Sequence, residues 1–252
     1  MKLADKNGHF RDAHMFFDEA PHIYYIDGVK VKTSVTTFIH ENFPVFNSER
    51  VATFCHKSHF NNPEKKYYQM PVQEILAKWK NDGLAAAGLG TKMHKSIESY
   101  YNDENIPEDM INSLEFGYFQ NFVKDFPELK PYRTEWEVYD EEHNLAGSID
   151  MVYENPDGTL LIYDWKRSKE IKHNNSEKGF GILSQIPDAN FWHYSIQLNT
   201  YKHILETKYG KTVTGLYLVI IHPNFENYMR LQVPDLSELV TQMFAERKLS
   251  LS

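Results

Sequence analysis

Three side chains suited to metal and phosphate chemistry interrupt two apolar segments of this sequence. In GSIDMVYENPDGTLLIYDWKRSKE, residues 147–170, Asp150 lies within the first segment, and Asp164 and Lys166 end the second. Two convergent carboxylates suit a hard divalent cation, and a lysine beside them suits an anionic substrate or transition state. The alternative is that Asp164 and Lys166, two residues apart, share the solvated face of a half-buried strand.

The neighbouring residues favour the chemical interpretation. Residues 160–163, Leu-Leu-Ile-Tyr, are typical of a strand buried on both faces, where an unpaired charge is costly. The sequence ENPDG before them predicts a compact turn between two strands. Antiparallel neighbours then bring Asp150 and Asp164 to one end of the sheet, with Lys166 one pleat further along.

Two helical pairs and a pair of glutamates are further candidates. His94 and Glu98 share one face of an expected helix, as do Gln197 and Tyr201 further along the chain. Each pair also fits an ordinary position on a helix surface or in a core. Two glutamates of TEWEVY alternate along one face of an expected strand, normally a solvated face; they are Glu135 and Glu137.

The elements that position these residues follow from hydrophobic periodicity and turn signals. A hairpin is expected at 22–33, helix N-caps at Ser34 and Ser48, and a long polar loop at 168–188. Helices are expected at 71–81, 91–102, 107–125, 189–208 and 235–248, and strands at 132–140, 145–153, 159–166, 214–221 and 227–233. This order predicts an α/β (α+β) fold with a central mixed β-sheet flanked by helices.

Composition narrows the function classes. With 252 residues, 41% of them hydrophobic and 14% aromatic, the chain is long and apolar enough to fold around a sizeable core. Cys55 is the single cysteine, which excludes an intrachain disulfide, a cysteine-based zinc finger and a four-cysteine iron–sulfur cluster. The net charge of −8 argues against non-specific coating of nucleic acid but permits a local basic groove. Without an apolar run near 18 residues or a signal peptide, an intracellular protein with no membrane partner is expected.

Four motifs in order carry a family resemblance. GTKMH, TEWEVYDEEHNLAGSID, LLIYDWKRS and QLNTY resemble the PD-(D/E)XK nuclease superfamily, in its RecB-like exonuclease branch. In that branch a Gly-Thr-x-x-His helix, a Gly-x-x-Asp strand, an Asp-x-Lys strand and a Gln-x-x-x-Tyr helix build one active site. The match covers about residues 88–222, and HIYYIDGVKVKTSVTTFIHENFP near the start is similar to viral and phage nucleases of this branch. Because members with an iron–sulfur cluster supply four cysteines, this chain resembles the cluster-free members.

The resemblance implies a role for each matching residue. The implied ligands of Mg²⁺ or Mn²⁺ are Asp150, Asp164, His94 and the backbone carbonyl of Trp165. Glu135, or its neighbour Glu137, would bind a second metal ion through water. Lys166 would orient the attacking water and stabilise negative charge, and Gln197 and Tyr201 would contact the scissile phosphate. Further substrate contacts are implied for Arg167, Ser168 and Lys169. The 168–188 loop, with basic and aromatic groups, is expected to contact substrate as well.

The resemblance also implies an overall organisation and activity. Residues 88–252 would form a restriction-endonuclease-like nuclease core, on which the hairpin and helical region of residues 1–87 packs. The expected activity is metal-dependent hydrolysis of phosphodiester bonds, by an exonuclease acting on DNA ends or single strands in recombination, repair or replication. A recombination or replication protein is a candidate partner. The alternatives are an endonuclease of the same fold, a non-catalytic protein that binds nucleic acid, and a metal-binding structural domain.

Overall fold

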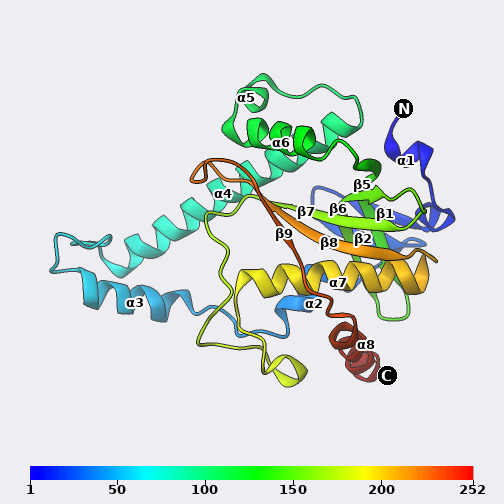
Figure 1. The fold of residues 1–252 in the computed structure, drawn as a ribbon. Helices are drawn as coiled ribbons and strands as arrows, with labels where there is room; N and C mark the ends of the chain where they lie inside the picture. The colour runs from blue at the N-terminus through cyan, green and yellow to red at the C-terminus, as the bar shows by residue number, and fades with distance from the viewer. Residues whose placement is uncertain (252) are drawn as a thin grey trace. The chain divides into compact units, whose positions relative to one another are not determined.

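The computed structural model describes residues 1–251 and divides into two compact units. The first unit combines Met1–Pro44 with the chain from Met93 onward, and the second is Val45–Lys92. Figure 1 traces the elements in chain order. The helices are α1 (Leu3–Lys6), α2 (Val35–His40), α3 (Ser48–His59), α4 (Val72–Tyr101), α5 (Glu108–Ile111), α6 (Leu114–Asp125), α7 (Asn190–Lys208) and α8 (Ser237–Leu251), with short 3₁₀ turns at Phe10–His14 and Gly181–Leu183. No helix among the described residues has the length and apolar character needed to cross a membrane.

The first unit is built on a mixed sheet, as the sequence predicts, and this sheet has six strands. Its strands are β4 (Thr33–Ser34), β5 (Lys130–Asp140), β6 (Leu145–Glu154), β7 (Leu160–Lys166), β8 (Val213–Ile220) and β9 (Met229–Gln232). β5, β6 and β7 form the expected antiparallel meander, and α7 connects β7 to its parallel neighbour β8. A small separate sheet holds β1 (Met15–Asp18), β2 (Ile23–Ile26) and β3 (Val29–Lys30). This confirms the α/β prediction of a mixed sheet flanked by helices.

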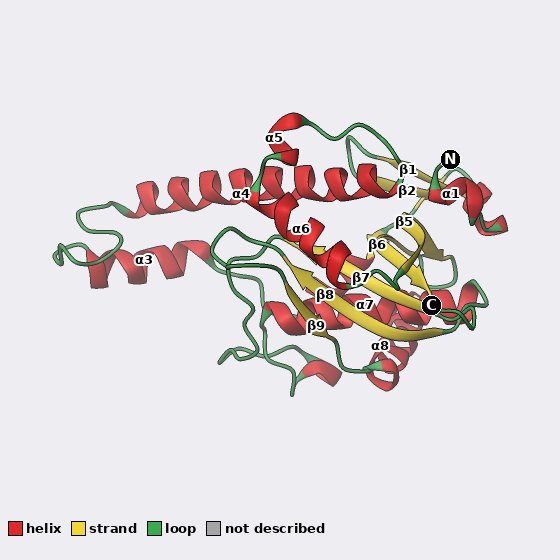
Figure 2. Ribbon diagram, turned by 45° about the horizontal axis from the view of Figure 1, so that its top comes forward, coloured by secondary structure: helices red, strands yellow, loops and turns green. Residues whose placement is uncertain are grey.

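Alternating side chains of the central strands bury two hydrophobic cores, one on each face of the sheet. Val152 and Ile162 belong to the core that includes residues of α2, α7 and α8. Met151 and Tyr163 belong to the other core, with α6 and the end of α4. Figure 2 shows the sheet in yellow between these helices. Both faces are therefore covered, and polar groups on β6 and β7 have to be paired or functional.

Several local predictions have clear outcomes. The hairpin turns at Asp27 and Gly28, which both have positive φ, and the side chain of Ser34 caps α2 by accepting from the Thr37 N–H. Ser48 as a cap is wrong, because the Asn47 side chain accepts the Arg50 N–H. The expected helix at 107–125 is interrupted, because the side chain of Ser113 caps the start of α6 and α5 ends before it.

The expected break between helices at 71–81 and 91–102 is also wrong, since α4 is continuous over Val72–Tyr101. Three alanines at 85–87 favour helix strongly and offset the glycines beside them. Each end of α4 is anchored separately, by Ile75 in the core of the second unit and by Met93 and Ile97 in a core of the first. Helix is therefore the state that both anchored ends favour.

Gly88 leaves α4 weakly stabilised near the boundary of the two units. A Cβ added at Gly88 meets nothing within 4 Å, so the glycine is not needed for packing and costs about 1 kcal/mol relative to alanine. We expect Gly88→Ala to slow hydrogen exchange of nearby α4 amides about fivefold. Gly210→Ala is a control with the opposite expected sign. Gly210 has φ +60°, so an alanine at this position is strained and should destabilise the protein. Unchanged exchange in Gly88→Ala would show that this segment is not limited by helix propensity.

Candidate active site

The candidate site lies where β6 and β7 separate. Their ladder runs from Glu154↔Leu160 to Met151↔Tyr163 and stops there. Because β5 occupies one edge of β6 along its length, β7 shares the other edge with β4, which pairs only with Leu145 and Ala146. Residues 147–150 of β6 therefore line an opening between two strands, and Asp150 is the last of them.

In this opening the Asp150 carboxylate accepts a backbone hydrogen bond that a carbonyl of β6 would accept in a regular ladder. Its Oδ2 accepts the backbone N–H of Trp165 at 2.9 Å, where a regular ladder would continue with a carbonyl. In a strand the N–H and C=O of one residue point to the same edge, so the Trp165 carbonyl also faces the side of Asp150. The meander thus brings together the Asp150 carboxylate and the Trp165 backbone carbonyl, two of the groups that the family resemblance implies as metal ligands.

His94, Glu135 and Asp150 form a group of potential metal ligands whose donor atoms all lie within 4.8 Å of one another. His94 Nδ1 lies 3.5 Å from Asp150 Oδ2 and 4.0 Å from Glu135 Oε1. Glu135 and Asp150 face each other across β5 and β6, between the pairs Thr134↔Met151 and Trp136↔Ile149. Glu135 has φ +41°, a left-handed conformation that is strained for a residue with a side chain.

Charges in this group repel one another. Burial and the neighbouring Asp150 raise the pKa of Glu135 well above its ordinary value, although Ser148 Oγ donates to it at 3.0 Å. Two carboxylates and an imidazole are ligands that a divalent cation accepts, and such a cation removes the repulsion. The donor set therefore fits a divalent metal ion. Glu137, the alternative strand glutamate, is not in this group.

Asp164 and Lys166 form a buried ion pair beside the group. Lys166 Nζ lies 2.9 Å from Oδ1 and 2.8 Å from Oδ2 of Asp164. Burial raises the pKa of Asp164 to about 6, against the opposing effect of the ammonium. Burial lowers the pKa of Lys166, but the charges of Asp164 and Asp150 outweigh it and the lysine stays protonated. The Asp164 carboxylate lies outside the three-ligand group and is engaged by the lysine.

A second acidic cluster behaves differently. Asp140, Glu142 and His143 also bring their donor atoms close together. Lys208 lies 3.5 Å from Asp140 and 3.1 Å from Glu142, and Lys248 also pairs with Glu142. Cations of the protein already balance these carboxylates, so this cluster is a structural ion-pair network. The group at Asp150 is the one whose negative charge is incompletely balanced.

The repulsion at Glu135 leads to a stability prediction. The pKa of Glu135 is higher in the folded protein than its ordinary value of 4.5. The Glu135 carboxylate therefore destabilises the fold increasingly as the pH rises above 4.5. We expect Glu135→Gln to raise the melting temperature in EDTA at neutral pH by about 2–4 °C, and to have little effect near pH 4. Added Mg²⁺ should stabilise the wild type more than the variant. Glu154→Gln is the control, because Glu154 is paired with Lys130 and its replacement should give no gain. A melting temperature of Glu135→Gln below that of the wild type in EDTA at neutral pH would contradict the repulsion between Glu135 and Asp150.

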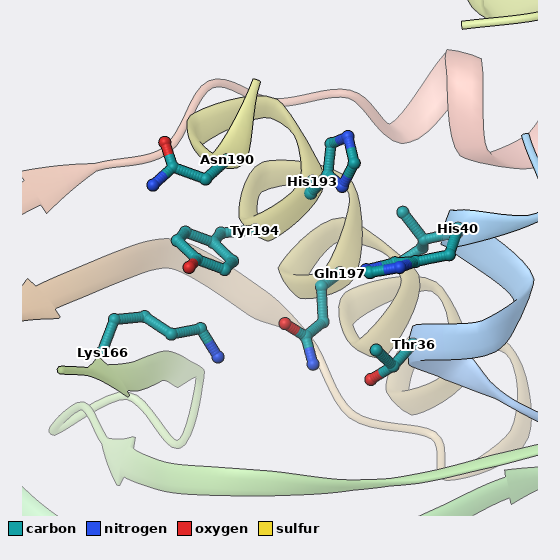
Figure 3. A pocket seen from close by; sticks show the side chains of 8 residues that line it. Thr36, His40, Lys166, Asn190, His193, Tyr194 and Gln197 are labelled. Atoms are coloured by element: carbon teal, nitrogen blue, oxygen red, sulfur yellow. The ribbon is translucent and has the colours of Figure 1, made fainter. Parts of the chain in front are cut away.

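A pocket of about 290 Å³ adjoins Lys166. Its lining residues come from α2, β7 and α7: Thr36, Ile39, His40, Lys166, Asn190, His193, Tyr194 and Gln197. In Figure 3 the lysine extends below the Tyr194 ring toward Gln197, with His40 and His193 on the other side. Lys166 Nζ lies 4.9 Å from the centre of the Tyr194 ring, an attractive cation–π distance. Lys166 contributes an ammonium to the pocket lining, and Asn190 and Gln197 contribute amide groups, all of which suit phosphate oxygens.

Gly147 explains two of the sequence motifs in physical terms. A Cβ at this position would lie 2.8 Å from the hydroxyl oxygen and 2.9 Å from Cε1 of Tyr201. Tyr201 is buried, and its hydroxyl lies 3.5 Å from Nε2 of Gln197. Gly147, the glycine of the Gly-x-x-Asp strand, thus leaves space for Tyr201 of the Gln-x-x-x-Tyr helix. Tyr201 in turn contacts Gln197 of the same helix.

Other predicted site residues lie apart from the group. Arg167 donates to Glu115 at 2.9 Å, Ser168 donates to the Glu170 carbonyl, and Lys169 is exposed. The 168–188 loop is anchored at Asn190, whose side chain accepts the Lys172 N–H and donates to the Glu170 carbonyl. Leu183 in the same loop is fully buried and anchors the loop to the core, whereas most of the other loop residues are exposed.

Two histidines of the pocket, His40 and His193, are not predicted as site residues from the sequence. His193 Nε2 lies 2.8 Å from Asp188 Oδ1, and its ring stacks on Phe43 at 4.1 Å between centroids. Burial lowers the pKa of His193. The available signal was spacing, since His193 lies four residues before Gln197 on the same face of the expected helix. His40 belongs to a segment far away in sequence, and no local pattern links it to this site.

Comparison with known proteins decides the family. Residues 110–250, more than half of the chain, match the PD-(D/E)XK nuclease superfamily. The chain belongs to this superfamily. The matched residues of this PD-(D/E)XK nuclease include Asp150, Asp164, Lys166, Gln197 and Tyr201, whereas His94 lies before them. Membership implies a hydrolase of phosphodiester bonds, and nucleases of this superfamily use divalent metal ions.

Solved structures similar to this PD-(D/E)XK nuclease include the crystal structure of SSO0001, at 14% identity and a TM-score of 0.35. That match covers 87% of this chain and 76% of the other. A second match is a candidate exonuclease from Eubacterium rectale, at 13% identity and a TM-score of 0.30, covering 57% of this chain and 62% of the other. No curated protein matches the sequence.

Proposed function

We propose that this PD-(D/E)XK nuclease is a divalent-metal-dependent deoxyribonuclease of the RecB-like branch, acting as an exonuclease on DNA ends or single strands. The observation that carries the proposal is the gathering of His94, Glu135 and Asp150 beside the buried Asp164–Lys166 pair. Potential metal ligands and a cation for phosphate thus meet at one opening in the sheet. The assignment of residues 88–252 as the nuclease core and 1–87 as a region packed on it stays a prediction.

The proposed metal ion is Mg²⁺ or Mn²⁺, without an iron–sulfur cluster. We assign it to His94, Glu135 and Asp150, with the Asp164 carboxylate and the Trp165 carbonyl as further ligands. When bound, the ion supplies Lewis acidity toward phosphate oxygens and makes a water molecule more acidic. The ligand charges that repel one another in the protein alone are the source of its affinity for a cation.

The remaining side chains bind and orient the phosphate. Lys166, which stays protonated, places an ammonium where negative charge grows on the phosphate during attack by water. Gln197 presents an amide at the edge of the same pocket, supported from below by Tyr201. Because the lysine is held by Asp164 and the ring of Tyr194, it needs little reorganisation when substrate arrives.

The wider context follows from the same resemblance. We propose a role in recombination, repair or replication of DNA, with a recombination or replication protein as the expected partner. The start of the chain supports a viral or phage-type nuclease, acting inside a cell. Arg167, Ser168 and Lys169 remain predicted substrate contacts, of which Lys169 is the exposed one.

Digestion of labelled DNA tests the function. Linear single- and double-stranded DNA, labelled at the 5′ or the 3′ end, is incubated beside a covalently closed circle with Mg²⁺, Mn²⁺ or EDTA. We expect the linear substrates to be degraded with either metal, no cleavage in EDTA and an intact circle. Cleavage of the circle would replace the exonuclease with an endonuclease of the same fold. No cleavage in any metal would contradict the catalytic assignment.

A further inference from the structure

The second unit, Val45–Lys92, carries a charge opposite to that of the whole chain. It contains seven lysines and arginines against four aspartates and glutamates, whereas the whole chain has 27 against 35. Its small core holds Ala52, Tyr67 and Ile75, with Cys55 and Trp79 packed against them. A basic helical unit in an acidic protein is suited to a polyanionic partner.

One face of α3 concentrates exposed basic and aromatic groups. Arg50, Phe54 and Lys57 occupy positions i, i+4 and i+7, so they follow one another along one side of the helix. This side is opposite Ala52 and Cys55, which face the core of the unit. Phe54 is 70% exposed, and both cations are exposed. We call Arg50, Phe54 and Lys57 the α3 stripe.

Neither folding nor ion pairing accounts for the α3 stripe. Among residues 1–251, no ion pair involves Arg50 or Lys57, and the Phe54 ring stacks on no other aromatic ring. Arg50 lies in the first turn of α3, where the helix dipole disfavours a positive charge. A solvent-exposed phenylalanine between two unpaired cations contributes little to stability, but it offers a stacking surface flanked by phosphate-binding groups.

We propose that the α3 stripe is a binding surface for single-stranded DNA, with a base stacked on Phe54 and backbone phosphates on Arg50 and Lys57. The two cations are separated by about 10 Å along the helix axis. That separation leaves room between them for a nucleotide on the aromatic ring. The proposal rests on the proposed function for its substrate, but it assigns DNA contacts to residues outside the active site.

Binding measured without cleavage tests the stripe. Fluorescence anisotropy in EDTA, with a labelled oligothymidylate about 20 nucleotides long, gives affinities over a range of salt concentrations. We expect Arg50→Ala/Lys57→Ala to reduce the slope of log K against log salt by about 1.4, since each single-strand phosphate contact contributes about 0.7. Phe54→Ala should weaken binding about 5- to 150-fold and leave the slope unchanged.

The controls are exposed residues of the first unit. Lys124→Ala removes an exposed lysine, and Phe10→Ala removes a phenylalanine that is 76% exposed. Both should bind like the wild type. Equal affinity and slope for all variants, or a wild type that does not bind the oligothymidylate, would overturn the stripe whatever the cleavage assay gives. Conversely, stripe-dependent binding without any cleavage would leave the stripe standing and remove the proposed catalytic function.

Discussion

Lys166→Ala should reduce DNA cleavage at least 10³-fold while metal binding persists, because this lysine supplies the ammonium next to the reacting phosphate and is not a metal ligand. Its Nζ contacts both oxygens of Asp164, and the side chain is mostly buried. The neighbouring Arg167 is engaged with Glu115 and is therefore not available to replace it. Turnover should therefore fall without a matching loss of metal-induced stabilisation.

Asp150→Asn should lose both DNA cleavage and metal-induced stabilisation. Asp150 is a member of the three-ligand group and also accepts the Trp165 N–H, which an asparagine oxygen still accepts. The fold is thus kept while one ligand charge is removed, so cleavage and the rise in melting temperature with Mn²⁺ should disappear together. Lys130→Ala is the control for Lys166→Ala, because it also removes a lysine, but one that is exposed at the start of β5 and pairs with Glu154.

The measurement pairs initial rates of cleavage with melting temperatures in EDTA and in Mn²⁺. Lys166→Ala leaves the buried Asp164 without its cation, so a lower melting temperature in EDTA is expected and the Mn²⁺ arm is the informative one. Cleavage by Lys166→Ala within tenfold of the wild-type rate would contradict the role given to the lysine. A full Mn²⁺ response in Asp150→Asn would contradict the ligand group.

Sequence alone predicts the central part of the fold well. The meander of β5, β6 and β7 is local, since each strand is followed by a turn with recognisable residues. Asp150, Asp164 and Lys166 can be recognised as candidates because a charge within an apolar strand is costly unless it is paired or bound to an ion. The helix at Gln197 is likewise set by local periodicity. These features depend on neighbours in the chain, which the sequence displays directly.

Features that depend on distant partners could not be predicted. The separation of β6 from β7 at Met151 is invisible in either strand, because it arises where the Asp150 carboxylate accepts the Trp165 N–H. The choice between Glu135 and Glu137 as neighbour of Asp150 was also open. The register of β5 on β6 decides it, because Glu137 pairs with Ser148 and Glu135 lies between the pairs that flank Asp150. Glu135 also has a positive φ, a backbone conformation that no propensity predicts. The pocket histidines depend on the packing of α2 against α7.

Gly147→Ala should destabilise the protein and impair cleavage, although glycine-to-alanine changes in strands usually stabilise. The new Cβ would lie 2.8 Å from the Tyr201 hydroxyl oxygen, 2.9 Å from Tyr201 Cε1 and 3.1 Å from Cγ2 of Val35. Tyr201 and Val35 are both buried, so neither moves without disturbing the core. Overpacking of this kind costs about 1–3 kcal/mol, which lowers the melting temperature by several degrees.

The same clash explains the expected loss of activity. A displaced Tyr201 no longer supports Gln197, whose amide borders the pocket beside Lys166. Adding Tyr201→Phe to Gly147→Ala removes the hydroxyl that makes the shortest contact, so the double variant should recover part of the lost stability. Gly117→Ala in α6 is the matched control, because a Cβ there meets nothing within 4 Å and should be neutral or stabilising. If Gly147→Ala were as stable as Gly117→Ala, or the second change recovered nothing, Tyr201 would not be the reason for glycine at this position.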